Sequence, residues 1–235
     1  MLAGLAALLV LPAVGATSRR ALLPGPPGSA TAWTARLVAP VTALSAPVSG
    51  RLVDRQSAFG SWSGGQVSLL VLGARTGSDG ELWLRVLLPV RPNGTSGWVP
   101  ADTVELGTTD WRIEISTERR TVEVFDHGSR VRTWAAVVGA PGTPTPHGLF
   151  AVYERVPLPD PAGFYGPWEL HLTALSNVLT AFDGGPGRVA IHGRGGTSLR
   201  DPLGTARSHG CIRIDNSAIR FLATHVPIGT PVVVT

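Results

Sequence analysis

The sequence predicts a mainly β fold in two parts, and three observations support this. The chain has 29 glycines and 20 prolines among 235 residues, a composition that favours short strands and turns over long helices. Apolar and polar residues alternate in segments such as 111–115 and 121–125, as they do in half-buried strands. This pattern breaks at 106–110, where we expect the boundary between two domains.

The charge and the cysteine content of the chain limit which binding partners and which cysteine chemistry are expected. All 20 basic residues are arginine, and the formal net charge is only +4. The arginines are scattered along the chain and form no basic stripe, so nucleic acid is not an expected partner. Cys211 is the single cysteine. It has no partner for an intramolecular disulfide, which leaves an intermolecular link or a reactive thiol.

The first 35 residues predict an export signal and a tether. Residues 2–11 form an apolar run that is too short to span a bilayer. Small residues follow at 14–16, so we expect 1–16 to be a signal peptide and the mature chain to lack a stable membrane span. No basic residue precedes the run, and a buried N-terminal helix is the alternative. Residues 17–35 are rich in Pro, Gly, Ser and Ala and predict a flexible linker.

Residues 36–107 predict a small β-module. We expect strands at 35–38, 48–52, 66–74, 82–87 and 97–100, with Asn93-Gly94 as a hairpin turn. The segments Trp83-Leu84-Arg85-Val86 and Gly97-Trp98-Val99-Pro100 resemble the end of bacterial Src-homology-3-like domains. That resemblance implies a small five-stranded β-barrel that positions or targets the protein on the cell wall.

Residues 110–235 predict a second β-domain. Expected strands cover 111–115, 121–125, 131–138, 148–153, 168–175, 188–192 and 231–235, with a short helix at 217–224 capped by Asn216. The segment 157–168 is rich in Pro, Gly and aromatic residues, which is typical of a lid or binding loop. Within it, Tyr165 and Trp168 either contact a substrate or pack locally.

The candidate site lies between residues 191 and 213. Cys211 follows His209 by two positions and His192 by nineteen, and glycines fill the intervening loop. A thiol needs a nearby base to become a nucleophile at neutral pH. Either histidine is a candidate base, and a Gly-rich loop leaves backbone N–H groups free to hold an oxyanion. The pattern predicts cysteine-based acyl transfer. A zinc site of His192, His209 and Cys211 is the alternative, although His-x-Cys is not the usual ligand spacing.

The same residues carry a resemblance to a family. His192-Gly193 and Ser208-His209-Gly210-Cys211-Ile212-Arg213 resemble the signature of the L,D-transpeptidases with a YkuD-type catalytic domain. Pro144-Thr145-Pro146 and Tyr165-Gly166-Pro167 also match that family. The resemblance covers about the last 125 residues. It implies a YkuD-type β-sandwich catalytic domain at 110–235, preceded here by the Src-homology-3-like barrel.

The resemblance also implies roles for individual residues. Cys211 would be the nucleophile, His192 its base, and the Gly193 carbonyl would orient the imidazole. The N–H groups of Gly210 and Cys211 would form the oxyanion hole, and His209 would shape the pocket or support the oxyanion. The family needs no metal and no other cofactor. Candidate substrate-binding residues are Ser208, Tyr165, Trp168 and Arg213, the last of which could instead pair with Asp215 or another acid.

The implied reaction takes place on peptidoglycan in the cell wall or a periplasm-like space. Cys211 would attack the stem tetrapeptide at its diamino-acid residue and expel the terminal D-alanine. The amine of a second stem peptide would then resolve the thioester and give a 3→3 cross-link. Carbapenems would acylate the same thiol. Two alternatives remain at this point, an L,D-carboxypeptidase that uses water as the acceptor and a non-catalytic wall-binding protein.

Overall fold

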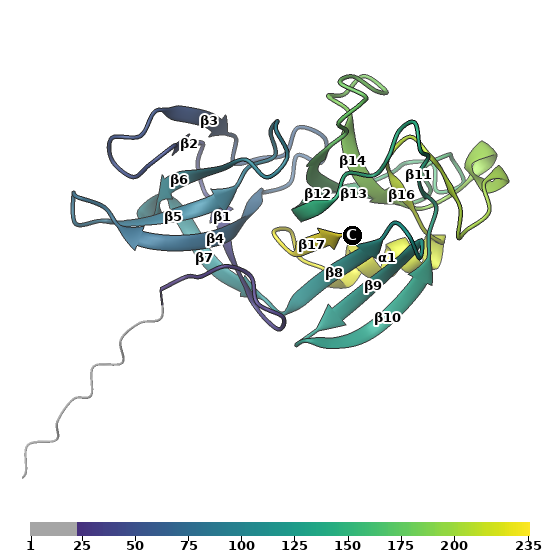
Figure 1. Ribbon diagram of the computed structural model, residues 1–235, viewed down its shortest axis with the longest axis horizontal. Helices are drawn as coiled ribbons and strands as arrows, with labels where there is room; N and C mark the ends of the chain where they lie inside the picture. Colours follow the sequence, from purple (N-terminus) through teal and green to yellow (C-terminus); the bar gives the residue numbers. More distant parts are fainter. Residues whose placement is uncertain (1–22) are drawn as a thin grey trace, which may run out of the picture.

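The computed structural model describes residues 23–235 and shows two β-modules side by side (Figure 1). The described part of the chain contains seventeen strands, one α-helix and two short 3-10 helices. The prediction of a mainly β fold is therefore confirmed. The expected signal peptide at 1–16 and the first part of the expected linker, residues 17–22, lie outside the described residues. The last part of that linker, residues 32–35, belongs to strand β1. No helix among residues 23–235 has the length and apolar character needed to cross a membrane.

The first module is a sheet with strand order β3-β2-β6-β5-β4-β1-β7. It has seven strands, whereas five were expected. Its strands are β1 (Ala32–Leu37), β2 (Val41–Leu44), β3 (Leu52–Gln56), β4 (Ser68–Thr76), β5 (Leu82–Leu87), β6 (Ser96–Pro100) and β7 (Val104–Thr109), with a 3-10 turn at Ala101–Thr103. The alternating residues of these strands bury a separate apolar core that includes Leu37, Leu69, Leu84 and Val99. Its likeness to Src-homology-3 domains remains a prediction.

Two expectations for this module were wrong in detail. Of the expected strand 48–52 only Leu52 is in a strand, as the first residue of β3, and residues 48–51 are not. Val48 has a left-handed φ of 65°, and the Gly50 N–H donates to the Ala46 carbonyl, so this stretch is the turn between β2 and β3. The segment 106–109 does not interrupt the β-pattern either. It belongs to β7, which pairs along its whole length with β1.

The second module contains an eight-stranded sheet with the order β10-β9-β8-β17-β12-β13-β14-β16. Its elements are β8 (Trp111–Ser116), β9 (Thr121–Asp126), β10 (Ser129–Ala135), β11 (Val138–Gly139), β12 (Gly148–Pro157), β13 (Trp168–Leu175), β14 (Arg188–His192), a 3-10 helix (Gly196–Arg200), β15 (Ala206–Ser208), β16 (Ile212–Arg213), α1 (Asn216–His225) and β17 (Pro231–Val234). The predicted strand 131–138 is split in two, because β11 leaves the meander and pairs with β15.

Strand β12 joins the two halves of this sheet. Its first half, residues 148–151, pairs with β17, and its second half pairs with β13. Helix α1 packs against the same apolar core with Ala218, Ile219, Leu222 and Ala223. It begins at Asn216, one residue before the expected start. Burying these four side chains is worth several kcal/mol at about 25 cal/mol per Å² of apolar area.

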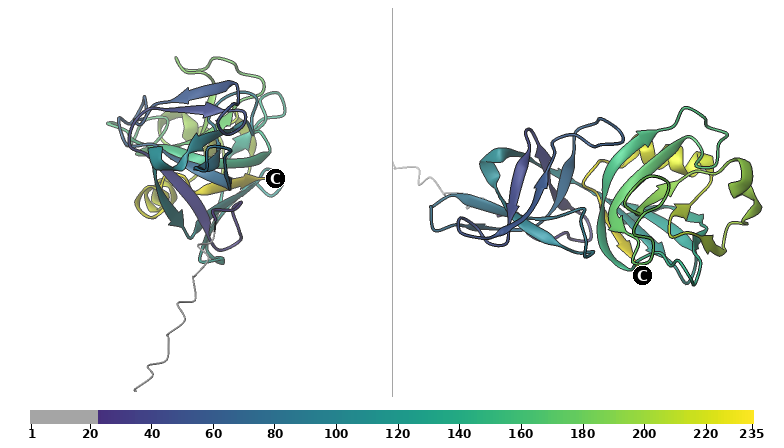
Figure 2. Two further views of the ribbon diagram at one scale, coloured as in Figure 1. Left: turned by 90° about the vertical axis from the view of Figure 1, so that its left-hand side faces the viewer. Right: turned by 90° about the horizontal axis from the view of Figure 1, so that it is seen from above.

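The two modules are firmly joined. An apolar cluster of Ala32, Leu70, Leu87 and Ala151 is fully buried between them. The Asn93 amide bridges the backbone of Leu175: its nitrogen donates to the Leu175 carbonyl (2.7 Å), and its oxygen accepts from the Leu175 N–H (2.9 Å). The right-hand view of Figure 2 shows the two modules next to each other, with loops of the first module extending towards the second.

Candidate active site

The site lies on one face of strands β13, β14 and β16. Successive residues of a strand point to opposite faces, and here the alternate residues Leu170, Leu172, Ile191 and Ile212 are fully buried in the core. The intervening residues therefore share the other face, and the strand registers place them side by side. Glu169 lies opposite His192, His171 lies opposite Ala190, and His192 lies opposite Arg213. The parallel register of β14 and β16 brings Cys211 next to Ala190, on the face that carries His192.

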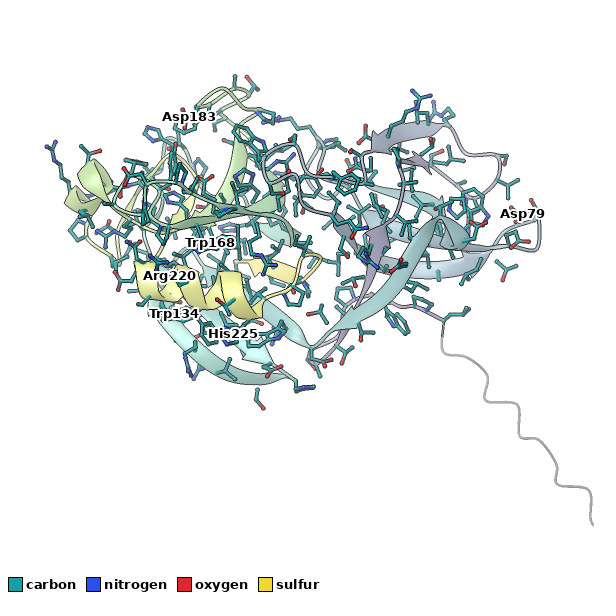
Figure 3. The ribbon with its side chains drawn as sticks, turned by 180° about the vertical axis from the view of Figure 1, so that it is seen from behind. Asp79, Trp134, Trp168, Asp183, Arg220 and His225 are labelled. Atoms are coloured by element: carbon teal, nitrogen blue, oxygen red, sulfur yellow. The ribbon has the colours of Figure 1, made fainter. Side chains whose placement is uncertain are left out.

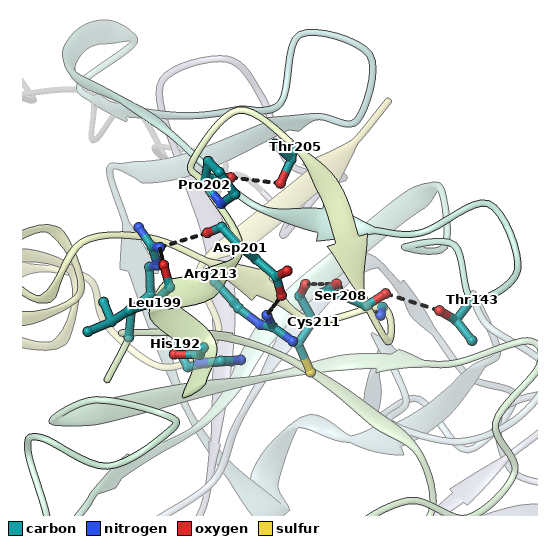
Figure 4. Close-up of polar contacts among 12 residues, drawn as sticks. Thr143, His192, Leu199, Asp201, Pro202, Thr205, Ser208, Cys211 and Arg213 are labelled. Carbon is teal, nitrogen blue, oxygen red and sulfur yellow. Dashed lines mark hydrogen bonds and ion pairs between the residues drawn. The ribbon is translucent and has the colours of Figure 1, made fainter. Parts of the chain in front are cut away.

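His192 is held in one orientation. Its side chain is buried, and Nδ1 lies 2.8 Å from the Gly193 carbonyl oxygen. A carbonyl only accepts hydrogen bonds, so Nδ1 carries the proton and Nε2 of the neutral ring is the basic nitrogen. Figure 4 shows the ring of His192 extending towards the side on which the Cys211 sulfur lies. The Gly193 carbonyl thus takes the place expected for it beside the imidazole.

Burial changes the pKa values of both groups in opposite directions. It lowers the pKa of His192 from 6.5 to about 4, against the opposing effects of Glu169 and the Gly193 carbonyl. It raises the pKa of Cys211 from 9.0 to about 11, although a backbone hydrogen bond with Ala190 and the charge of Arg213 act in the other direction. Near neutral pH the resting site therefore holds a neutral imidazole and a neutral thiol. Such a pair can perform general-base catalysis, because the imidazole is free to take the thiol proton during attack.

This arrangement predicts an unusual pH dependence for alkylation of Cys211. Only the thiolate reacts, so the rate with iodoacetamide should rise about tenfold per pH unit until the thiol pKa is reached. Because the pKa is about 11, we expect a continuous rise from pH 6 to pH 10. A small-molecule thiol, measured in parallel, levels off near pH 8.5. A plateau in the protein at or below pH 7 would instead indicate a thiolate–imidazolium pair and would contradict this prediction.

The turn that carries Cys211 is fixed by Ser208. The Ser208 hydroxyl donates to the Cys211 carbonyl (2.6 Å) and accepts from the Gly210 N–H (3.1 Å). Thr145 donates to the Gly210 carbonyl, which ties the turn to the proline-rich loop before β12. The Gly210 N–H was expected in the oxyanion hole, and in this structure it is engaged with Ser208. The Ser208 side chain is buried, so its hydroxyl holds the turn.

Arg213 is part of a buried ion pair. Its guanidinium donates to the Asp201 carboxylate at 2.6 Å and stacks over the Phe164 ring, and the side chain is only 4% exposed. Of the two alternatives, the structure shows an ion pair, with Asp201 and not Asp215 as its partner (Figure 4). The fixed positive charge lies close enough to lower the pKa of both His192 and Cys211.

Tyr165 and Trp168 lie in different surroundings. The Tyr165 ring stands edge-on to His192, with centroids 5.0 Å apart, and its hydroxyl donates to Asp183 (2.5 Å). Burial and the Asp183 carboxylate raise the pKa of Tyr165 above its usual value, so the phenol stays protonated. Trp168 instead packs against the core, on the side of the sheet that faces α1 (Figure 3). Local packing is therefore the role that the structure gives Trp168.

His209 differs from His192 in exposure. It is exposed, and its ring packs against Phe182 with centroids 5.2 Å apart. Together with Phe182 and Leu179 it lines a small hollow that reaches Cys211. The zinc alternative requires His192, His209 and Cys211 to converge, but no group of three or more metal-ligating side chains occurs among the residues that the structure describes.

A larger cavity of about 250 Å³ opens onto Cys211. Residues that the sequence did not single out contribute to it: Trp62 from the first module, Glu169 and His171 from β13, and Phe182 and Asp183 from the β13–β14 loop. The alternation of β13 could have indicated Glu169 and His171. Nothing local could have indicated Trp62, because its position depends on how the two modules pack.

Asn216 is a further residue with a role that the sequence did not reveal. It was expected only as a helix cap. Its side-chain oxygen accepts from the Arg194 N–H (2.8 Å), directly after Gly193. A Cβ on Gly193 would collide with the same Asn216 oxygen and with Pro167. Glycine at 193 therefore lets the chain pass close to α1 and present its carbonyl to His192.

Comparison with known proteins identifies the family of the second module. The model of the L,D-transpeptidase catalytic domain, YkuD, matches residues 110–234. A relative described as L,D-transpeptidase YkuD of Bacillus licheniformis is 33% identical over 128 residues, which cover 54% of this chain and 67% of the relative.

Solved structures give matches of limited extent. The catalytic domain of the L,D-transpeptidase from E. faecium is 25% identical, with 54% of this chain and 97% of that chain covered and a TM-score of 0.38. Bd1075 of Bdellovibrio bacteriovorus is also 25% identical, with a TM-score of 0.41. The match covers 54% of this chain but only about half (48%) of that one. Since the family model covers more than half of the 235 residues, the chain belongs to the YkuD family of L,D-transpeptidase catalytic domains.

Proposed function

We propose that this chain is an exported cysteine L,D-transpeptidase that forms 3→3 cross-links between peptidoglycan stem peptides. The observation that carries the proposal is the pairing of β14 with β16, which places Cys211 on the same face of the sheet as His192, diagonally across the two strands. The Gly193 carbonyl holds Nδ1 of that histidine. Membership of the family supports the reaction class. Export and action at the cell wall are part of the proposal.

In the first half-reaction, Cys211 Sγ attacks the carbonyl that precedes the terminal D-alanine of a stem tetrapeptide. The thiol proton passes to His192 as the S–C bond forms. The C–N bond then breaks, and His192 returns the proton to the nitrogen of the leaving D-alanine. The products are a thioester on Cys211, free D-alanine and a neutral His192. The neutral ring at rest suits both proton transfers.

The developing oxyanion needs backbone donors. We assign this role to the Cys211 N–H, because the Gly210 N–H already donates to Ser208. Gly210 could contribute only if that hydrogen bond were exchanged for one to the oxyanion. One such donor is typically worth about 3 kcal/mol to the transition state. The positive charge of Arg213 also favours the anionic intermediate, acting from its buried pair with Asp201.

In the second half-reaction, the side-chain amine of a second stem peptide attacks the thioester. The C–N bond forms, the C–S bond breaks, and the amine proton passes through His192 to the leaving sulfur. Tyr165 contacts the bound peptides, because it lines the cavity at Cys211. We assign Ser208 and Trp168 no direct contact with substrate, since one holds the turn and the other lies in the core.

Carbapenems should acylate the same thiol. A structure of the E. faecium catalytic domain is described as acylated by ertapenem. In the present chain the nucleophile would be Cys211, because the sequence contains no other cysteine. The proposal thus includes covalent inhibition by carbapenems.

Incubation of the full chain with disaccharide-tetrapeptide tests the proposed reaction. We expect mass spectrometry to show free D-alanine together with a cross-linked dimer that retains one D-alanine. Tripeptide without dimer would identify water as the acceptor and make the chain an L,D-carboxypeptidase. Unchanged tetrapeptide, with a folded protein that also fails to react with ertapenem, would contradict catalysis and favour a wall-binding role.

A further inference from the structure

Trp62 is the one residue of the first module that lines the cavity at Cys211. It lies in the loop between β3 and β4, and its side chain is 49% exposed. Its ring stands edge-on to His171 on β13, with centroids 5.6 Å apart. On another side it meets the β13–β14 loop so closely that a Cβ on Gly185 would lie 3.1 Å from the indole. The indole therefore contacts two walls of the cavity and keeps part of its surface open.

A buried carboxylate fixes the loop that carries Trp62. Glu154, on β12, is only 1% exposed. Its Oε2 atom accepts from the Trp62 N–H (3.1 Å), the Ser63 N–H (2.9 Å) and the Ser63 hydroxyl (3.0 Å). A Cβ on Gly60 would overlap this carboxylate, so the loop wraps tightly around it. Three hydrogen bonds to one buried oxygen make the loop a preformed part of the cavity.

The chemistry of the cavity favours a cationic occupant. Three aromatic rings line it, those of Trp62, Tyr165 and Phe182, together with the carboxylates of Glu169 and Asp183. Aromatic faces and carboxylates are the groups that bind an ammonium ion and the alkyl chain behind it. Arg188 also lines the cavity, but both of its terminal nitrogens already donate to carbonyl groups.

The contacts of Arg188 leave it little capacity to bind a ligand. Its two terminal nitrogens donate to the carbonyls of Leu172 (2.9 Å) and Pro89 (3.2 Å), and its guanidinium stacks over Tyr153. It is therefore committed to joining the modules and offers little to an anionic ligand. Glu169 and Asp183 are two acidic groups against this one basic group. Glu169 Oε2 also lies 3.0 Å from His171 Nε2, and Asp183 accepts from the Tyr165 hydroxyl. The balance again favours an amine over a carboxylate.

We infer that the first module completes the acyl-acceptor subsite: Trp62 forms its outer wall, the subsite takes the amine-bearing side chain of the acceptor peptide, and Glu154 is the positioning residue. The inference rests on the proposed transpeptidase function and adds the part of the substrate that this cavity receives. The cavity reaches Cys211, so an amine bound there can approach the thioester. The first module would then affect the choice between amine and water as acceptor.

The test compares Trp62→Ala with Phe59→Ala in the full chain. Phe59 is a matched control, because it is an aromatic residue of the same loop, 58% exposed, and does not line this cavity. The assay uses disaccharide-tetrapeptide as donor and increasing amounts of a disaccharide-tripeptide with a free side-chain amine as acceptor. Trp62→Ala should raise the acceptor KM about tenfold, as expected for loss of one cation–π contact, and lower the ratio of dimer to hydrolysed tripeptide. Phe59→Ala should leave both within twofold.

Acylation by ertapenem separates failure of this inference from failure of the proposed function. Trp62→Ala should be acylated within twofold of the wild-type rate, because a small β-lactam does not need the acceptor subsite. Normal acylation with an unchanged acceptor KM would overturn the inference and leave the proposed function intact. Equal loss of acylation and transfer would also overturn it, since Trp62 would then support the whole site. A wild-type chain that is acylated but yields no dimer at any acceptor concentration would refute the proposed function itself.

Glu154→Gln provides the second variant. It keeps the shape of the side chain but removes the charge that binds the Trp62 and Ser63 donors. We expect a rise in the acceptor KM, smaller than for Trp62→Ala, with little change in kcat. A merely structural role would lower kcat and ertapenem acylation together, and that result would contradict the assignment of Glu154 as a positioning residue.

Discussion

Replacing Cys211 by alanine is expected to abolish covalent labelling by ertapenem. Intact-mass spectrometry of the wild-type chain should show one adduct, because the sequence contains a single thiol. The variant should show no adduct at the same time and concentration. The reason is chemical: the sulfur belongs to the single thiol of the sequence and lies on the same sheet face as the neutral imidazole of His192. Dimer formation from disaccharide-tetrapeptide should disappear with it.

Two comparisons make this result decisive. A thermal unfolding midpoint of Cys211→Ala close to that of the wild-type chain would show that lost labelling is not lost folding. Cys211→Ser, which keeps the size and polarity of the side chain, should give the same result. The Cys211 side chain is only partly buried, and removing one sulfur atom should change stability by about 1 kcal/mol or less. An adduct of unchanged mass on Cys211→Ala would place the acylated residue elsewhere and overturn the assignment.

The sequence predicted two of the three strands that carry the site, β13 and β14, but not the two-residue strand β16. Strands β5, β13 and β14 agree with the expected ranges residue for residue. In these segments apolar and polar residues alternate, and this alternation indicates both that the segment is a strand and which of its side chains face the core. That alternation also places Cys211, His192 and Arg213 on one face once the register of β14 and β16 is known. The register itself is a long-range property. The pairing of β14 with β16 was not predicted from the sequence and is known only from the structure.

The features that the sequence missed depend on contacts between distant segments. Asp201 and Arg213 are twelve residues apart, whereas Trp62 and His171 come from different modules. No local pattern distinguishes Trp62 from an ordinary exposed tryptophan. Asn93-Gly94 is a similar case. The hairpin signal was sufficient to explain the pair, yet the Asn93 amide also joins the first module to Leu175 at the end of β13. The roles of these residues therefore arise from packing between the modules, and local sequence patterns do not indicate them.

His192 should be the second most sensitive position in the protein. His192→Gln replaces the imidazole by a side chain that can still donate to the Gly193 carbonyl but cannot accept a proton. Loss of a general base typically slows the reaction by about 10²- to 10⁴-fold, and we expect a loss in this range for acylation by ertapenem. Stopped-flow or mass-spectrometric acylation rates would measure it. His209→Ala should cost far less, since that exposed ring packs on Phe182 away from the Gly193 carbonyl.

The pH profile separates a base from a residue that only supports the site. Burial lowers the pKa of His192 to about 4, so the ring is neutral and able to accept a proton above that pH. The wild-type acylation rate should therefore stay level from about pH 8 down to pH 5 and fall only as the pH approaches 4. In His192→Gln this fall in rate near pH 4 should disappear, and most of the rate should be lost at every pH. If the variant is slow but its rate still falls near pH 4, a group other than His192 must be responsible for the pH dependence. Retention of normal rates in His192→Gln, with a large loss in His209→Ala, would transfer the base role to His209, although His192 is the ring that the Gly193 carbonyl orients.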